Sequence, residues 1–164
     1  MDFGRRNLLR GRLRRAPAAV RPPGALSEPD FLSVCDRCGD CSRACPEGIV
    51  ARGDGGFPTI DFQAGGCTFC GLCAKACKPG ALAATPSWPL KASFGERCLS
   101  AQGVVCRVCG ERCEAAAIRF RPMPGGFSRP ELTAEACTGC GACVAPCPVA
   151  AVTVAPRTEM AACA

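Results

Sequence analysis

Hydrophobic residues along this chain occur in short runs, separated by segments rich in glycine and proline. The runs predict short strands at 58–62 and 130–133, and short return strands at 48–50, 81–82, 117–120 and 151–154. Turns are expected at 53–56 and 122–126, and segment 86–89 around Trp88 is expected to link two halves. No apolar run reaches the length of a membrane span. The pattern therefore predicts a body of small units made of strands and turns.

The hydrophobic core that this composition allows is thin. Leu, Ile, Val and Phe together account for 31 of the 164 residues, and Gly and Pro account for another 34. So few large side chains cannot easily offset chain entropy by burial, and such a low fraction suggests disorder unless something else holds the chain together. The 17 cysteines are the obvious candidate.

The cysteines form four runs. Three runs share the strict spacing C-x2-C-x2-C-x3-C, and a looser run has a first gap of seven residues. The fourth cysteines of successive runs lie 32, 36 and 34 residues apart, which is a period typical of duplicated supersecondary units. The strict runs are Cys35, Cys38, Cys41 and Cys45; Cys67, Cys70, Cys73 and Cys77; and Cys137, Cys140, Cys143 and Cys147; the looser run is Cys98, Cys106, Cys109 and Cys113.

This spacing indicates [4Fe–4S] clusters, three from the strict runs and a fourth from the looser run. A C-x2-C-x2-C loop wraps three thiolates around a cluster, and in two-cluster ferredoxins the fourth cysteine binds the other cluster. We hypothesise such a crossing, in which each set of three is completed from another run: the first by Cys77, the second by Cys45, the looser by Cys147 and the last by Cys113. Glycines 39, 71 and 141 follow the second cysteine of each strict run, where a residue without Cβ can adopt positive φ beside a cluster.

Zinc, disulfides and free thiols are the alternatives. Zinc sites usually pair two C-x2-C knuckles across a dozen or more residues, and the absence of His excludes mixed Cys/His sites. Disulfides require an oxidising compartment. The Arg5-Arg6 pair echoes a twin-arginine export signal, but further arginines interrupt the apolar stretch that a signal needs. We therefore expect a soluble, cytoplasmic protein with reduced cysteines. The looser run has the alternative of a degenerate repeat without its cluster, and Cys163 is expected to be a free thiol.

The positive charge is concentrated at the N-terminus. Residues 1–27 carry seven Arg and one Asp, whereas residues 28–164 carry 13 basic and 13 acidic side chains. Clusters on thiolates would make the body negative, which leaves a basic arm on an acidic body. The candidate partner-binding residues are Arg5, Arg6, Arg10 and Arg12. A disordered tail, a tail lying on the body, and an amphipathic membrane-surface segment are the alternatives.

Catalysis of acid–base type is not expected from this sequence. The chain has no His and no Tyr, and it contains no glycine-rich phosphate loop followed by Lys and Ser or Thr. No pair of acidic residues suggests a general acid and base, and no nucleic-acid partner is expected. The function should therefore lie in electron transfer or partner binding.

The order of these features resembles the NapF family of ferredoxin-type proteins, which belongs to the periplasmic nitrate reductase system. The resemblance covers nearly the whole chain and rests on the Arg5-Arg6-Asn7-Leu8-Leu9 start, the Arg21-Pro22-Pro23 segment, the order of strict and loose runs, and segment 118–122. The second run departs slightly, with Lys78-Pro79 after its last cysteine. The resemblance implies a cytoplasmic accessory protein that binds the catalytic subunit of nitrate reductase before export and helps it mature. An electron donor protein is a further implied partner.

Two other functions share the same clusters: a soluble polyferredoxin electron carrier, and a wiring subunit of a redox complex. The expected fold is α+β, with duplicated bacterial two-[4Fe–4S] ferredoxin-like units of small strands and short helices around the clusters. The expected divisions are a basic arm at 1–27, repeats at 28–57 and 58–88, a degenerate repeat at 89–127, a third strict repeat at 128–158, and a tail at 159–164.

Overall fold

The computed structural model describes residues 19–83 and 88–156, so that Arg5, Arg6, Arg10, Arg12 and Cys163 lie outside the described residues. The helices are α2 (Glu28–Val34), α3 (Asp40–Arg43), α4 (Leu72–Lys75) and α5 (Val108–Glu111), with 3-10 turns η1 (Asp54–Gly56) and η2 (Ser100–Gln102). The strands are β1 (Val50–Arg52), β2 (Pro58–Ile60), β3 (Leu90–Phe94), β4 (Ile118–Pro122), β5 (Ser128–Leu132) and β6 (Val152–Pro156).

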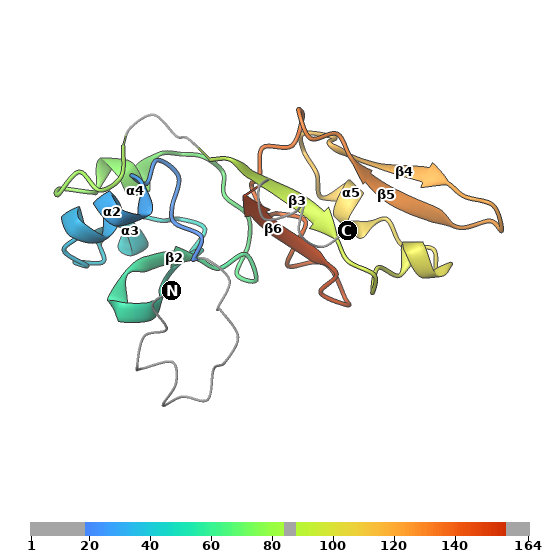
Figure 1. Ribbon diagram of the computed structural model, residues 1–164, viewed down its shortest axis with the longest axis horizontal. Helices are drawn as coiled ribbons and strands as arrows, with labels where there is room; N and C mark the ends of the chain where they lie inside the picture. Colours follow the sequence, from blue (N-terminus) through green and yellow to red (C-terminus); the bar gives the residue numbers. More distant parts are fainter. Residues whose placement is uncertain (1–18, 84–87, 157–164) are drawn as a thin grey trace.

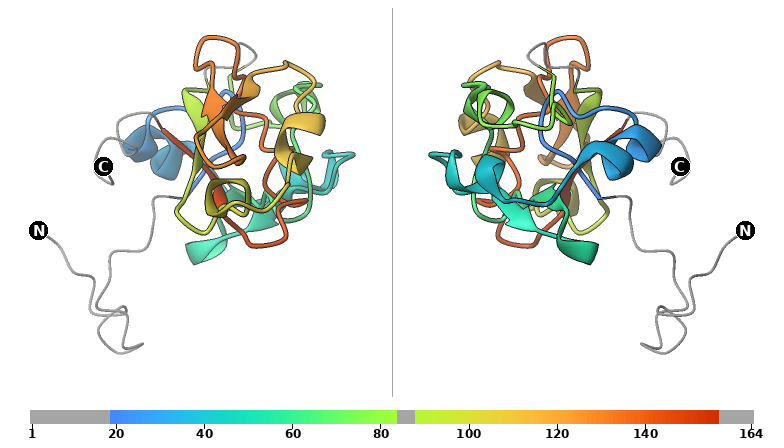
Figure 2. Two further views of the ribbon diagram at one scale, coloured as in Figure 1. Left: turned by 90° about the vertical axis from the view of Figure 1, so that its right-hand side faces the viewer. Right: turned by 90° about the vertical axis from the view of Figure 1, so that its left-hand side faces the viewer.

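The described residues form an elongated body of two halves. The first half, with α2, α3 and α4, and the second half, with α5, β4 and β5, lie toward opposite ends of the long axis (Figure 1). Viewed along that axis, the two halves overlap within one compact outline (Figure 2). None of the helices in the described ranges combines the length and apolar character that crossing a bilayer requires.

Both halves repeat the same pairing of strands. Each contains an inner antiparallel hairpin, β1–β2 in the first half and β4–β5 in the second. Each also pairs a segment from its beginning with a segment from its end: β3 with β6 in the second half, and the single bridge between Ala25 and Leu82 in the first. This shared pairing supports the predicted duplication.

Most predicted strands and turns are confirmed. The predicted strands at 48–50, 58–62, 117–120, 130–133 and 151–154 correspond to β1, β2, β4, β5 and β6 with small shifts in their ends, whereas 81–82 contributes one bridge. The turn at 53–56 contains η1, and the turn at 122–126 is closed by a hydrogen bond from the Met123 N–H to the Phe127 carbonyl. Helix α2 and strand β3 were not predicted.

The short helices expected beside the cysteines are found in three of the four runs. Helices α3, α4 and α5 span four residues each, and each includes the third cysteine of its run and the two residues that follow it. The last run forms turns over 142–146 and no helix. The reason is Pro146, because the equivalent residues Ala44 and Ala76 donate their N–H groups to carbonyls four residues earlier, a bond that proline cannot make.

The core is small and includes cysteines. Its largest fully buried side chains are those of Phe31 and Ile49, and the thiols of Cys41, Cys109 and Cys143 are buried in the same cluster of contacts. Other core members are mainly Val, Ile, Leu and Ala from the strands of both halves. The thin core predicted from composition is therefore confirmed, and it surrounds the cysteines closely.

Candidate metal centres

The first group of thiols comes from two runs. Cys35, Cys38 and Cys41 of the first run line one cavity together with Cys77, the last cysteine of the second run. Helix α3 carries Cys41 and follows Gly39, whose φ of 79° starts the helix from the left-handed region. This grouping has the crossed form that we hypothesised from the sequence.

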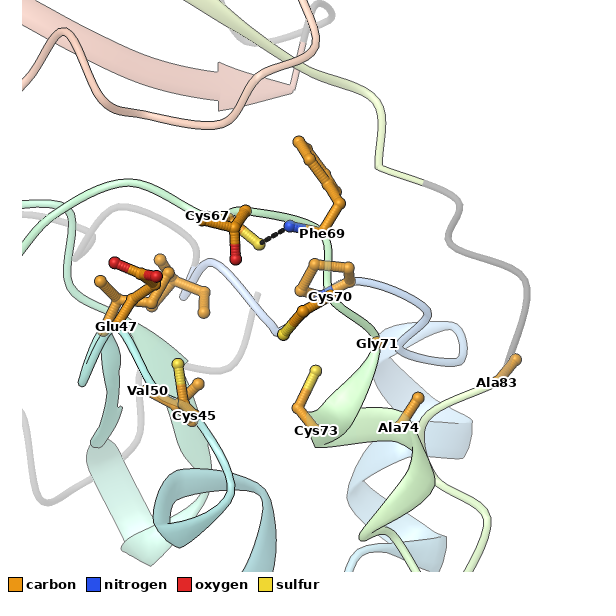
Figure 3. A pocket seen from close by; sticks show the side chains of 14 residues that line it. Cys45, Glu47, Val50, Cys67, Phe69, Cys70, Gly71, Cys73, Ala74 and Ala83 are labelled. Carbon is orange, nitrogen blue, oxygen red and sulfur yellow. Dashed lines mark hydrogen bonds between the residues drawn. The ribbon is translucent and has the colours of Figure 1, made fainter.

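A second group mirrors the first. Cys67, Cys70 and Cys73 line a cavity with Cys45, the last cysteine of the first run. Their sulfur atoms face a common space below the Cys67–Gly71 loop (Figure 3). The walls of this cavity are largely apolar, and the backbone N–H of Phe69 donates to the Cys67 sulfur at 3.4 Å. An apolar wall with N–H groups directed at sulfur is suited to an iron–sulfur cluster.

The second half brings together thiols of the looser and last runs. Cys98 and Cys106 lie close enough to Cys109 to repel its thiolate, and Cys137 and Cys140 act in the same way on Cys143. Cys109 also acts on Cys143, so these two groups are neighbours. The contacts do not assign Cys113 and Cys147 to a group, and the crossing of these two cysteines stays a prediction.

The looser run shares its exit turn with the strict runs. In all four runs the residue three places after the fourth cysteine has positive φ, and its N–H donates to the carbonyl of that cysteine. These residues are Gly48, Gly80, Ala116 and Ala150. The N–H of the following residue donates to the cysteine sulfur in two runs: that of Ala117 to Cys113 at 3.3 Å, and that of Ala151 to Cys147 at 3.2 Å. This shared turn could not be recognised from the sequence, because alanine stands in two repeats where the other two have glycine.

The entry loop of the looser run is different. In the strict runs the glycine after the second cysteine has a φ between 73° and 79°, which confirms the prediction for Gly39, Gly71 and Gly141. Arg107 takes this place in the looser run and has a φ of −133°. The looser run therefore lacks the entry loop that carries three candidate ligands at the strict spacing, although it keeps the exit turn.

Burial disfavours charge on the thiols. It raises the pKa of Cys41 and of Cys67 to about 11, and repulsion from neighbouring cysteines adds to the effect. Burial likewise raises the pKa of Cys109 to about 11 and that of Cys143 to about 12. Such thiols ionise when a cation binds them, because metal coordination compensates the buried negative charge.

The donor set fits an iron–sulfur cluster. In the first half, each of the two groups gathers four thiols around one cavity. Within the described ranges, no three Cys, Asp or Glu side chains meet closely enough to hold a single metal ion. Thiols spread around a cavity match a cubane with four separate iron corners.

Comparisons with known proteins agree with this chemistry. A family model described as a 4Fe-4S dicluster domain matches residues 34–81 and again residues 104–151, once in each half. The ferredoxin-type protein NapF of Escherichia coli K12 is 43% identical over 155 residues, covering 93% of this chain and 94% of the relative. NapF of Haemophilus influenzae is 41% identical, covering 82% of this chain and 78% of the relative.

A more distant relative is named for a different pathway. The methylamine utilization ferredoxin-type protein MauM of Methylorubrum extorquens is 36% identical over 161 residues, covering 85% of this chain and 73% of the relative. The dicluster domain matches twice, and the similarity to NapF extends over nearly the whole chain. These matches show that the protein is an electron-transfer protein and not an enzyme. The chain belongs to the NapF family of ferredoxin-type 4Fe-4S proteins.

Proposed function

We propose that this protein holds four [4Fe–4S] clusters and uses them to assist the catalytic subunit of periplasmic nitrate reductase in the cytoplasm, before export. The observation that carries the proposal is the gathering of four thiols from two runs around each cavity of the first half. The NapF relatives support the link to nitrate reductase. Each cluster, when bound, accepts or releases one electron.

The proposed ligands follow the crossed grouping. The sites are, in order, Cys35, Cys38, Cys41 and Cys77; Cys67, Cys70, Cys73 and Cys45; Cys98, Cys106, Cys109 and Cys147; and Cys137, Cys140, Cys143 and Cys113. The looser run supplies three ligands of the third site and has the irregular entry loop. The exit turn of the same run, after Cys113, has the form found in the strict runs and supports a retained cluster fold in this repeat. An iron content near 16 per chain supports four clusters, and a content near 12 indicates three.

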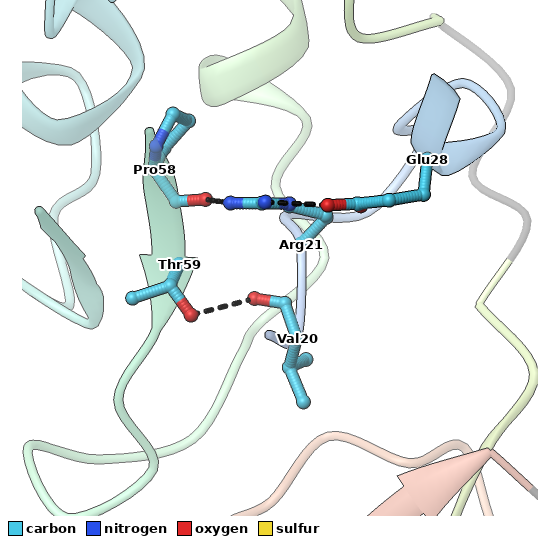
Figure 4. A network of polar contacts seen from close by, with 5 residues as sticks. All are labelled: Val20, Arg21, Glu28, Pro58 and Thr59. Carbon is cyan, nitrogen blue, oxygen red and sulfur yellow. Dashed lines mark hydrogen bonds and ion pairs between the residues drawn. The ribbon is translucent and has the colours of Figure 1, made fainter. Parts of the chain in front are cut away.

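The proposed partner-binding residues are Arg5, Arg6, Arg10 and Arg12. The chain that follows them is fixed to the body by Arg21, whose guanidinium donates to both Glu28 carboxylate oxygens at 2.6 and 3.0 Å and to the Pro58 carbonyl at 2.9 Å (Figure 4). The Val20 carbonyl also accepts a hydrogen bond from the Thr59 hydroxyl. These contacts hold Val20 and Arg21 beside β2.

Co-purification tests the partner. Tagged protein and the catalytic subunit of nitrate reductase are expressed together, and capture is compared between wild type and a variant with Arg5, Arg6, Arg10 and Arg12 changed to Gln. We expect both proteins to contain equal iron and only wild type to retain the subunit. Capture that is equal in the two samples would reject the role of these arginines, and no capture in either would reject the partner.

A soluble electron carrier is the second candidate function. It is favoured by the MauM relative, a ferredoxin-type protein of methylamine utilization. A carrier would exchange electrons with small iron–sulfur or flavin proteins without a stable complex. Normal iron content and reduction, combined with failure to bind the catalytic subunit, would favour this function.

A further inference from the structure

The two halves meet through their cysteine loops. The backbone N–H of Cys67, in the loop of the second run, donates to the carbonyl oxygen of Cys140 in the last run at 2.8 Å. Both cysteines, with Gly66 and Ala142 beside them, line one groove between the halves. A direct main-chain hydrogen bond therefore joins a candidate ligand of one half to a candidate ligand of the other.

The approach of the two loops is as close as main chains allow. A Cβ atom added to Gly66 would lie 2.8 Å from the Ala142 Cβ and 2.9 Å from its Cα and N atoms. Real Cβ atoms are not found at such distances, so a side chain at position 66 would separate the loops. Gly66 does not have the positive φ that demands glycine, so its lack of a side chain serves the contact and not the backbone conformation.

Aromatic side chains hold the contact from both sides. Phe62 is 8% exposed, and its ring fills the space where a Cβ of Gly141 would lie. Trp88, at the start of the second half, packs with its ring centroid 6.0 Å from that of Phe62 and 5.3 Å from that of Phe69. The halves are thus packed together around the Cys67–Cys140 hydrogen bond, which fixes the distance between their metal sites.

We propose that electrons cross between the two halves at this loop contact, from the Cys67 site to the Cys140 site and back. The inference rests on the proposed clusters. The step moves one electron: one site is oxidised by it, the other is reduced by it, and no bond or proton is transferred. Gly66 and Ala142 are positioning residues, because their small size sets the separation across which the electron passes.

The groupings within each half extend this path. The first two sites exchange their fourth cysteines, and Cys109 and Cys143 are both buried in the core. The Cys67–Cys140 contact therefore links the pair of sites in the first half to the pair in the second. Without the link, each half would be an independent two-cluster unit.

Re-oxidation of the reduced protein tests the link. Purified holoprotein is reduced with dithionite, freed of excess reductant, and mixed with one equivalent of ferricyanide, and the spectrum is followed over time. EPR of the reduced samples reports magnetic interaction between sites. The variants are Gly66→Ala and Ala142→Val, which separate the loops from either side. Gly95→Ala is the matched control, since a Cβ there meets only the Ala151 oxygen at an ordinary 3.5 Å and the φ is not positive.

We expect electrons to redistribute in one kinetic phase in wild type and in Gly95→Ala, and in two phases in both loop variants. The loop variants should also lose the EPR interaction between the halves, at unchanged iron content. Single-phase behaviour in iron-replete loop variants would overturn the proposal. If neither loop variant keeps its iron, the wild-type measurement tests the proposal by itself. One kinetic phase then supports the link, and two phases refute it. Wild type without iron would instead overturn the proposed function itself.

Discussion

Replacement of two equivalent glycines by alanine separates two costs that act on the cysteine loops. Gly71 and Gly141 follow the second cysteine of their runs and have φ values of 73° and 79°. A Cβ on Gly71 would meet nothing within 4 Å, whereas a Cβ on Gly141 would overlap the Phe62 ring. Gly71→Ala therefore carries only the cost of the left-handed backbone, and Gly141→Ala adds a steric cost.

The magnitudes follow from these two terms. The left-handed conformation costs a non-glycine residue about 1–2 kcal/mol, and both variants share this term. Overpacking against a buried ring adds about 1–3 kcal/mol to Gly141→Ala only. Contacts between the halves join segments far apart in sequence and should form late in folding, so the added cost should appear mainly in the unfolding rate. The expected ratio of unfolding rates is roughly five- to 150-fold.

Bleaching of the visible iron–sulfur absorbance after dilution into urea measures this rate, because cluster loss makes unfolding irreversible. Gly141→Ala should bleach faster than Gly71→Ala, and Gly71→Ala faster than wild type. Adding Phe62→Leu to Gly141→Ala provides the control, since a smaller side chain leaves room for the new methyl group. Equal bleaching of the two alanine variants would refute the reasoning that the Phe62 contact holds the halves together.

Three further predictions concern the metal sites and the N-terminal anchor. Chelation of iron should abolish most of the native circular dichroism, because the core is too thin to fold the chain without its cofactors, and a spectrum that persists after iron removal would contradict this. Cys77→Ala should lower the iron content by about four per chain, the iron of one cluster, as measured by a colorimetric assay, whereas Cys163→Ala should leave it unchanged. Arg21→Met should raise the urea bleaching rate about tenfold or more, because a charged hydrogen bond to the Pro58 carbonyl contributes about 1.5–3 kcal/mol. The guanidinium also lies over the rings of Phe31 and Phe57. Arg129→Met, at an exposed residue, is the control for this variant.

The sequence predicts the cysteine runs and the short strands because both depend on local spacing. Cysteines at every third residue can be recognised within a short segment of sequence. A short apolar run between two turns likewise predicts a strand without knowledge of its partner. The glycine after the second cysteine is equally local, and its positive φ is confirmed in all three strict runs. Such features need no knowledge of which segments meet in space.

Other features depend on distant partners and could not be predicted. Strand β3 forms because residues 90–94 find β6 some 60 positions later, as the pairing of Ser93 with Thr153 shows. The composition around Arg21 suggested a charged arm, yet this arginine is only 12% exposed because Glu28 and the Pro58 carbonyl lie within its reach. Pro146 is the exception: its effect on the helix of the last run is local, and it could have been predicted from the missing N–H.

On the proposed path, the packing between the halves links stability to electron transfer. A thin core gives each half few apolar contacts, so the loops that carry the cysteines must also supply the contacts between halves. Loops that supply those contacts lie close together. A Cβ added to Gly66 or to Gly141 would overlap atoms of the other half. A substitution that loosens this region should therefore accelerate bleaching and slow electron exchange together. A variant that changed only one of the two would show that packing and electron transfer are held by different residues.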